Sequence, residues 1–442
     1  MKRLLATSLL IAITFIGTSF AQTRSSGSAT STPNVTELKI NGLKVLIKRR
    51  PGAPTVSAGL YIRGGVDNYS AENSGIEEMT LQAMAEGGSK FPRAEMRRAL
   101  SRMGSSISGT STFDFGVFAM ASTNEHFSRT WDIFTDSAIK PAFESQSIGI
   151  VRERMLTFLR TQSTSPDGLL EVLTRRVAYR NHPYAKNPSG NLDTIGRFNE
   201  GDLRRYHERI LNTSHLLLVI VGDVDVSDIR KKVEESFGRL PVGEYKRGVT
   251  KELVFEKPSL ETVSRPLETT FVRGVFSAPN LTNPDYYAMR VAVSFLQMLV
   301  YQEVRTARNL SYAPDAEMND FNANSASIYV STTDVNQSIS VMLNQISLLK
   351  NVTLSQDQLS GIPNFFLTTY YIDNETNAAQ NGELARYELL GRGWREADRF
   401  ISNISSVTPE DIQRVAKRYM NNIQFVVVGN PSGLNREIFL RP

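Results

Sequence analysis

The chain contains no cysteine and only four histidines, His126, His182, His207 and His215, among its 442 residues. Without cysteine there is no disulfide, no cysteine nucleophile and no cysteine-ligated zinc or iron–sulfur cluster. No two histidines are three or four residues apart, so no helix face presents a pair of them to a metal ion. We expect His207 to be a surface residue of a charged helix, and His182, which precedes a proline, to be a turn residue held by hydrogen bonds. The sequence therefore indicates no zinc site built on histidine pairs.

The sequence also lacks the short motifs of several large enzyme classes. There is no G-x-S-x-G, no G-x-G-x-x-G and no phosphate-loop motif, so serine hydrolase, dinucleotide and nucleoside-triphosphate readings have no support. Neither sign of charge predominates, because 50 Lys and Arg residues nearly balance 45 Asp and Glu residues and leave a formal net charge of only +5. A dedicated nucleic-acid binder clusters many more basic residues, so we expect no nucleic-acid partner.

Long apolar runs are confined to the N-terminus. Lys2 and Arg3 precede a mostly apolar stretch at 4–17, and residues 19–21 form a small-x-small cleavage site. This pattern predicts a secretory signal peptide at 1–21, with an uncleaved anchor as the alternative. Residues 22–34 are rich in Ser, Thr and Gly and are predicted to form a disordered leader. We therefore expect a periplasmic or secreted protein with no membrane span after signal cleavage.

Apolar patterning and turn residues predict alternating strands and helices. Asn41-Gly42 predicts a hairpin over 37–48. A helix is predicted at 75–86, because Ser74 and Glu77 read as a capping box and two glycines end the helix. Residues 241–264, with scattered prolines, glycines and charges, are predicted to form an interdomain linker. Further predicted elements are strands at 55–63, 106–120 and 215–221, and helices at 93–103, 126–139, 146–163, 166–179 and 200–210.

The second half repeats the plan of the first. A capped helix followed by an apolar strand that ends in Gly occurs near the end of each half. The offset is 209 residues from Leu203 to Ile412 and 207 residues from Gly222 to Gly429. Two markers at nearly the same period favour a duplicated domain of about 200 residues. A chance similarity of helix and strand patterns is the alternative.

Several stretches resemble the pitrilysin/insulinase family of zinc peptidases. Residues 63–65 with Gly75-Ile76 match the strand and turn before that family's zinc helix, 182–184 match its His-Pro-Tyr triplet, and 216–224 match its glycine-ended strand. The resemblance covers the chain from position 38 to about position 433. The family includes mitochondrial processing peptidase, whose two subunits pair, and this chain resembles such smaller members. The resemblance implies an α+β fold, the LuxS/mitochondrial-processing-peptidase-like metallohydrolase fold, in which two homologous domains form half of a clamshell. Each domain is a mixed β-sheet packed with helices, and we place the two domains at 35–240 and 265–442.

The resemblance also implies that the catalytic motif is lost. Active members carry H-x-x-E-H in this helix, and Glu78, Leu81 and Gln82 stand at its His, Glu and His positions. The third zinc ligand of the family is a Glu about 75–80 residues later, where the local match places Arg160, with Glu153 as an out-of-register carboxylate. We expect Glu78 and Arg160 to form an ion pair across the degenerate site. The alternative is that both side chains point to solvent or to other partners.

A segment of the second half keeps more of the family pattern. Residues 301–312 resemble the family's R-E-x-x-G-L-x-Y segment, with Arg305 and Tyr312 on its Arg and Tyr. In the family these residues bind the substrate backbone and help to polarise the scissile carbonyl, which suits a fixed cation and a neutral donor. Asn309 replaces the usual Gly, and Asn tolerates a left-handed turn. The alternative is a surface Arg beside a half-buried core Tyr.

The resemblance thus implies a non-catalytic subunit of an exported heterodimeric zinc metallopeptidase. Its partner is expected to be a catalytic zinc-peptidase subunit of similar size that holds the zinc, while this chain binds none. The chain would bind extended peptide substrates, with the peptide added as a strand to a sheet edge, and supply Arg305 and Tyr312 to the partner's site. A stand-alone peptide-binding or assembly protein and an autonomous metallopeptidase are the alternatives.

Overall fold

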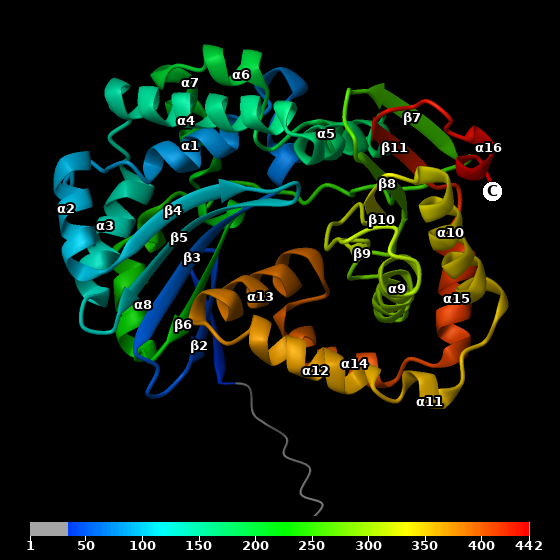
Figure 1. Cartoon of the computed structure of the whole chain (residues 1–442). Helices are drawn as coiled ribbons and strands as arrows, with labels where there is room; N and C mark the ends of the chain where they lie inside the picture. The colour runs from blue at the N-terminus through cyan, green and yellow to red at the C-terminus, as the bar shows by residue number, and fades with distance from the viewer. Residues whose placement is uncertain (1–33, 442) are drawn as a thin grey trace, which may run out of the picture. The chain divides into compact units, whose positions relative to one another are not determined.

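Two mixed β-sheets, each covered by helices, organise residues 34–441, the part of the chain that the computed structural model describes (Figure 1). The predicted signal peptide lies outside the described residues, as does the predicted leader except for Asn34. The first sheet has the order β1-β2-β6-β3-β5-β4 and the second the order β7-β11-β8-β10-β9. The strands of the first sheet are β1 (Val35–Ile40), β2 (Leu43–Arg49), β3 (Thr55–Arg63), β4 (Ser106–Ser111), β5 (Phe115–Thr123) and β6 (Leu216–Gly222). Those of the second are β7 (Ser259–Ser264), β8 (Thr270–Ser277), β9 (Asp315–Met318), β10 (Ser325–Thr332) and β11 (Gln424–Gly429).

Helices surround both sheets. Within residues 34–441, none is both long and apolar enough to cross a membrane. The predicted α+β fold of two helix-covered mixed sheets is confirmed. The helices are α1 (Ile76–Met84), α2 (Arg93–Met103), α3 (Phe127–Ile139), α4 (Ser145–Thr164), α5 (Pro166–Ala178), α6 (Leu192–Arg197), α7 (Glu200–Ile210), α8 (Val226–Glu235), α9 (Tyr286–Val300), α10 (Val335–Asn351), α11 (Gln356–Leu359), α12 (Ile362–Asp373), α13 (Asn377–Leu390), α14 (Phe400–Ser405), α15 (Pro409–Tyr419) and α16 (Arg436–Phe439).

The local sequence explains most of the strands. β6 lies between β2 and β3 and is buried along its whole length, which is why it reads as a continuous apolar run. The predicted hairpin between β1 and β2 turns at Asn41 and Gly42, whose φ angles of 45° and 86° suit the tight turn that Asn-Gly forms. The single strand predicted at 106–120 is wrong, because the chain turns back at 112–114 and forms the antiparallel pair of β4 and β5. The Thr112 amide, which bonds the Phe115 carbonyl at 2.8 Å, closes this turn.

The two sheets repeat one topology. The order β2-β6-β3-β5-β4 in the first half corresponds to β7-β11-β8-β10-β9 in the second. In each half the first of these pairs is parallel and the other pairs are antiparallel. β7, the counterpart of β2, lies at Ser259–Ser264, inside the predicted linker at 241–264. The linker therefore ends before residue 259. The scattered charges and prolines of this stretch give no strand pattern in the sequence, so its predicted end is too late.

One helix of each half packs against the sheet of the other half. α5 packs against β8 and β11 of the second sheet, and α13 packs against β3 and β6 of the first. Leu170 and Leu173 of α5 lie in one apolar cluster with Val426 and Val428 of β11. Asn381 of α13 is buried, and its side-chain amide donates to the Val219 carbonyl at 2.7 Å. This exchange explains why residues from 34 onward form one compact unit rather than two.

Candidate functional site

Helix α1 is the element that corresponds to the predicted zinc helix. It begins after Gly75, whose φ of 88° and close approach to Gly190 admit only glycine: an added Cβ would lie 2.6 Å from the Gly190 Cα. The predicted capping box of Ser74 and Glu77 is wrong. Because Gly75 is the cap, Glu77 falls one position too early to reach back, and the Ser74 hydroxyl instead donates to the Asn187 carbonyl at 2.6 Å.

Glu78 faces the edge strand β4. Its carboxylate accepts hydrogen bonds from the Thr110 hydroxyl at 3.1 Å, from the Ser111 amide and from the Gln82 side-chain amide. Burial raises the pKa of the Glu78 carboxyl, and these three donors oppose that shift. Glu78 and Gln82 therefore satisfy each other across one helical turn, at the two positions where active relatives carry zinc-binding histidines.

Leu81, at the position of the general base, belongs to the hydrophobic core. It is 0% exposed and packs against two glycines of the sheet. A Cβ added to Gly109 would lie 2.4 Å from the Leu81 carbonyl oxygen, and one added to Gly116 would lie 2.9 Å from its side chain. The two sheet strands therefore approach the helix closely at Leu81. The leucine therefore fills the space next to the sheet with apolar atoms and offers no proton acceptor.

Arg154 of α4, rather than Arg160, contacts the degenerate site. Its guanidinium lies 2.9 Å from the Gln82 side-chain oxygen and 3.5 Å from the Glu86 carboxylate. Arg160 forms no ion pair with Glu78, so the predicted pair is wrong. Six residues separate the two arginines, which is about 9 Å along a helix, and α4 meets α1 nearer the first of them. Glu153 is exposed and takes no part in these contacts.

The residues at this site do not fit zinc. They offer one buried carboxylate that is already engaged, a neutral amide and no imidazole, and the Arg154 guanidinium would oppose a cation electrostatically. Across residues 34–441, no group of three or more His, Cys, Asp or Glu side chains is arranged to hold a metal ion. Of the histidines, His182 is held in its turn as predicted, with its ring accepting from the Tyr184 amide at 3.1 Å. The prediction that His207 is a surface residue is wrong, since it is only 5% exposed.

Glu77 is the residue that sequence reasoning missed. Its side chain is fully buried, and its carboxylate accepts from Tyr206 at 2.5 Å, Ser111 at 2.7 Å and Asn68 at 3.1 Å. Burial raises the pKa of this carboxyl to about 7 from its usual value near 4.5, although all three hydrogen bonds lower it. Glu77 lies four residues before Leu81 and therefore on the same buried helix face, which was the available signal.

Replacing Arg154 with methionine is expected to lower the free energy of unfolding by less than about 1 kcal/mol. The Arg154 side chain is 51% exposed, and Glu86 keeps a second ion pair with Arg93 at 2.7 Å. The matched control is Arg160→Met on the same helix, which is expected to change nothing measurable. Urea unfolding of both variants tests this contrast, and a larger loss in Arg160→Met than in Arg154→Met would contradict it.

In the second half, Arg305 and Tyr312 come together. Arg305 lies in a π-helical turn at Tyr301–Thr306, and its guanidinium carbon is 4.0 Å from the Tyr312 ring centroid and 5.0 Å from that of Tyr301. Tyr312 is 80% exposed, which contradicts the alternative of a half-buried core tyrosine. Asn309 has a φ of 52°, the left-handed conformation that the sequence predicted for this glycine position. The pair therefore presents a stacked guanidinium and a phenol at the surface.

Two family profiles match most of the chain. The profile of insulinase (peptidase family M16) matches residues 44–190, and that of the peptidase M16 inactive domain matches residues 197–362. An uncharacterized zinc protease, YmxG, from Bacillus subtilis is 19% identical over 89% of this chain and 97% of its own length. A non-peptidase homolog, YmxG, from Helicobacter pylori is 20% identical over 84% of this chain and 88% of its own length.

Solved structures agree on the fold. The peptidase M16 inactive domain of Pseudomonas fluorescens superposes with a TM-score of 0.80 at 19% identity, over 90% of this chain and 98% of that one. A protease from Helicobacter pylori superposes with a TM-score of 0.81 at 16% identity, over 90% and 99% of the two chains. With two profiles covering most of the chain, an altered zinc helix and a shared fold, this protein belongs to the insulinase (M16) peptidase family, in which it lacks the catalytic motif.

Proposed function

We propose that this chain is the non-catalytic subunit of an exported two-subunit zinc metallopeptidase. One contrast carries the proposal: helix α1 persists with every motif position changed, while Arg305 and Tyr312 are kept and stacked, with Tyr312 exposed. The profile match to an inactive M16 domain and the similarity to a non-peptidase homolog support a pseudo-peptidase. The signal sequence expected at 1–21 supports export.

In this proposal the chain binds extended peptides and supplies the Arg305 guanidinium to the active site of a partner of similar size. The substrate would add to β4, an edge strand whose residues alternate between exposed and partly buried and which borders α1. Main-chain hydrogen bonds along such an edge give affinity with little sequence selectivity. Arg305 and Tyr312 would then reach the substrate carbonyl at the zinc centre of the partner, where fixed donors stabilise developing negative charge.

The decisive experiment uses the chain without residues 1–21, alone and mixed with a family member that retains H-x-x-E-H and is exported by the same cell. The chain alone is expected to hold no stoichiometric zinc by elemental analysis and to cleave no peptide. Peptide cleavage is expected on mixing, above the rate of the partner alone. Zinc-dependent cleavage by the chain alone, or no effect on any such partner, would overturn the proposal.

A further inference from the structure

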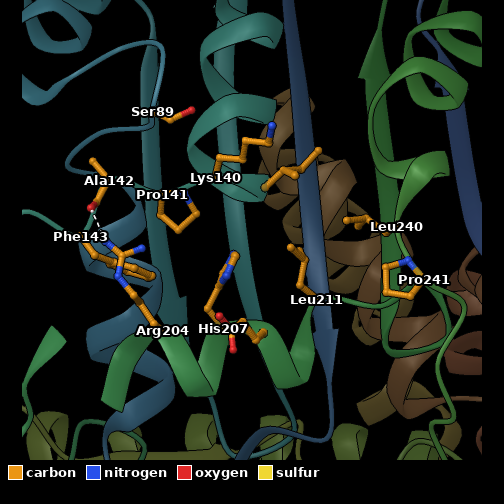
Figure 2. Close-up of a pocket in the computed structure, with 12 residues that line it drawn as sticks. Ser89, Lys140, Pro141, Ala142, Phe143, Arg204, His207, Leu211, Leu240 and Pro241 are labelled. Atoms are coloured by element: carbon orange, nitrogen blue, oxygen red, sulfur yellow. Dashed lines mark hydrogen bonds between the residues drawn. The ribbon is translucent and has the colours of Figure 1, made fainter. Parts of the chain in front are cut away.

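A cavity of about 650 Å³ lies in the first half, in a region that the proposed function does not use (Figure 2). It is formed by the loop at 139–143, by α7 and by the chain at Leu240 and Pro241. None of the degenerate-site residues and neither Arg305 nor Tyr312 lines it. Its size is within the range of pockets that enclose small ligands or a few residues of a peptide.

The loop wall of this cavity is held rigidly. The Ser89 amide donates to the Lys140 carbonyl at 2.9 Å, and the Ala142 amide donates to the Gly87 carbonyl at 3.0 Å. From α7, the Arg204 guanidinium donates to the Ala142 carbonyl at 2.9 Å, the bond that Figure 2 marks. The wall is therefore preformed, so a ligand would not have to order it on binding.

Phe143 is held in a conformation that aromatic residues rarely adopt. Its φ is 48° and its side chain is 2% exposed. In this conformation the ring lies 5.8 Å from the His207 ring and 5.5 Å from the Arg204 guanidinium carbon, both measured to the centroid of Phe143. Such strain costs of the order of 1 kcal/mol or more and persists only where the surroundings enforce it. Phe143 therefore lies behind the cavity wall, and the apolar side chains that reach the cavity surface are those of Ile139, Leu211 and Pro241.

The polar groups of the cavity are few and complementary. Neither Lys140 nor Glu208 forms an ion pair with any residue in the described range 34–441, and Lys140 is exposed. The His207 Nε2 lies 2.8 Å from the Ala138 carbonyl oxygen and donates to it, so Nδ1 is left as an acceptor. Burial lowers the pKa of His207, which keeps this ring neutral. The cavity thus offers one free cation for a carboxylate and two acceptors for N–H groups.

A second cavity lies beside the first. It has a volume of about 670 Å³ and shares the lining residues Ile139, Lys140 and Leu240. Lys140 therefore borders both cavities, so a ligand bound at Lys140 lies next to the second one.

From this arrangement we infer that the cavity binds the C-terminal end of a peptide whose last residue is apolar. The terminal carboxylate pairs with the Lys140 ammonium, and the last side chain packs on Ile139 and Leu211. The peptide N–H groups donate to His207 Nδ1 and to the Glu208 carboxylate. The preceding residues extend into the second cavity, which is why a peptide fits better than a free amino acid.

Calorimetric titration of the mature chain tests this site with three probes: Ala-Ala-Phe, its C-terminal amide, and free phenylalanine. The free-acid tripeptide is expected to bind at least about tenfold more tightly than the amide, because only the acid can pair with Lys140. Tighter binding of free phenylalanine than of the tripeptide would overturn the peptide assignment. Equal binding of acid and amide, or no binding of the acid at millimolar concentration, would overturn the site.

Two variants at exposed lysines locate the binding. Lys140→Met is expected to abolish the tenfold preference for the acid, while Lys90→Met, which changes a lysine of the second cavity only, is expected to keep it. Thermal unfolding of both variants should match the parent, since both side chains are exposed. Equal loss of preference in the two variants would overturn the role of Lys140.

Discussion

Replacing Arg305 with alanine is expected to lower kcat/KM of the proposed two-subunit enzyme by about 100-fold or more. A donor fixed beside a developing oxyanion contributes this much because it needs no reorganisation as the reaction proceeds. Arg305 meets the requirement, since its guanidinium is held by contacts with the rings of both Tyr301 and Tyr312. Arg305→Lys keeps the charge but loses planar stacking, so most of the loss should remain. Tyr312→Phe, which removes one hydroxyl and keeps the ring, should cost less than Arg305→Ala.

The control is Arg308→Ala in the same segment. Arg308 is paired with Glu303 at 2.5 Å on the exposed surface, so its loss is expected to leave turnover unchanged. Co-purification with the catalytic partner should be equal for both alanine variants, which separates a catalytic effect from failed assembly. If Arg305→Ala and Arg308→Ala have the same activity, the chain does not donate to the partner's site, and the stand-alone assembly function becomes the better account.

Replacing Glu77 with glutamine is expected to remove a pH dependence of folding stability. The pKa of Glu77 is about 7 in the folded protein, above the value near 4.5 of an exposed carboxyl. The folded protein therefore binds the proton more tightly than the unfolded chain. The resulting stabilisation is full below about pH 4.5 and is lost as the pH rises toward about 7, by an amount of the order of 3 kcal/mol.

The glutamine variant carries no such titration and keeps the size of the side chain. Its hydroxyl neighbours, Tyr206 and Ser111, can rotate to meet an amide. Urea unfolding of parent and variant from about pH 5 to about pH 8 measures the difference, and the parent should lose stability relative to Glu77→Gln across this range. Glu153→Gln, at an exposed position of α4, is the matched control, and its stability should vary with pH as that of the parent does. A constant difference between parent and Glu77→Gln would contradict the prediction.

Helix limits and strand character were largely predictable because they depend on local chemistry. The C-terminal end of α2, at Gly104 in the left-handed conformation, and the Asn41-Gly42 hairpin follow from capping and turn preferences that neighbouring residues set. The predicted duplication agrees with the matching strand order of the two sheets. The capping box failed because Gly75 moved the start of α1 by one residue, and the extra strand at β7 was hidden by its mixed, half-buried composition.

The sequence by itself determined what this protein lacks. Glu78, Leu81 and Gln82 cannot supply the imidazoles and the base of the zinc motif in any fold, because residue type limits donor chemistry. Only the tertiary structure decided what replaced the site. The choice of Arg154 over Arg160 depends on where α4 crosses α1, and the burial of His207 depends on its contact with Ala138, 69 positions away. Contacts between residues so far apart in the sequence produce no local sequence pattern. The packing of α4 on α1 and the burial of side chains in the core therefore become apparent only in the tertiary structure.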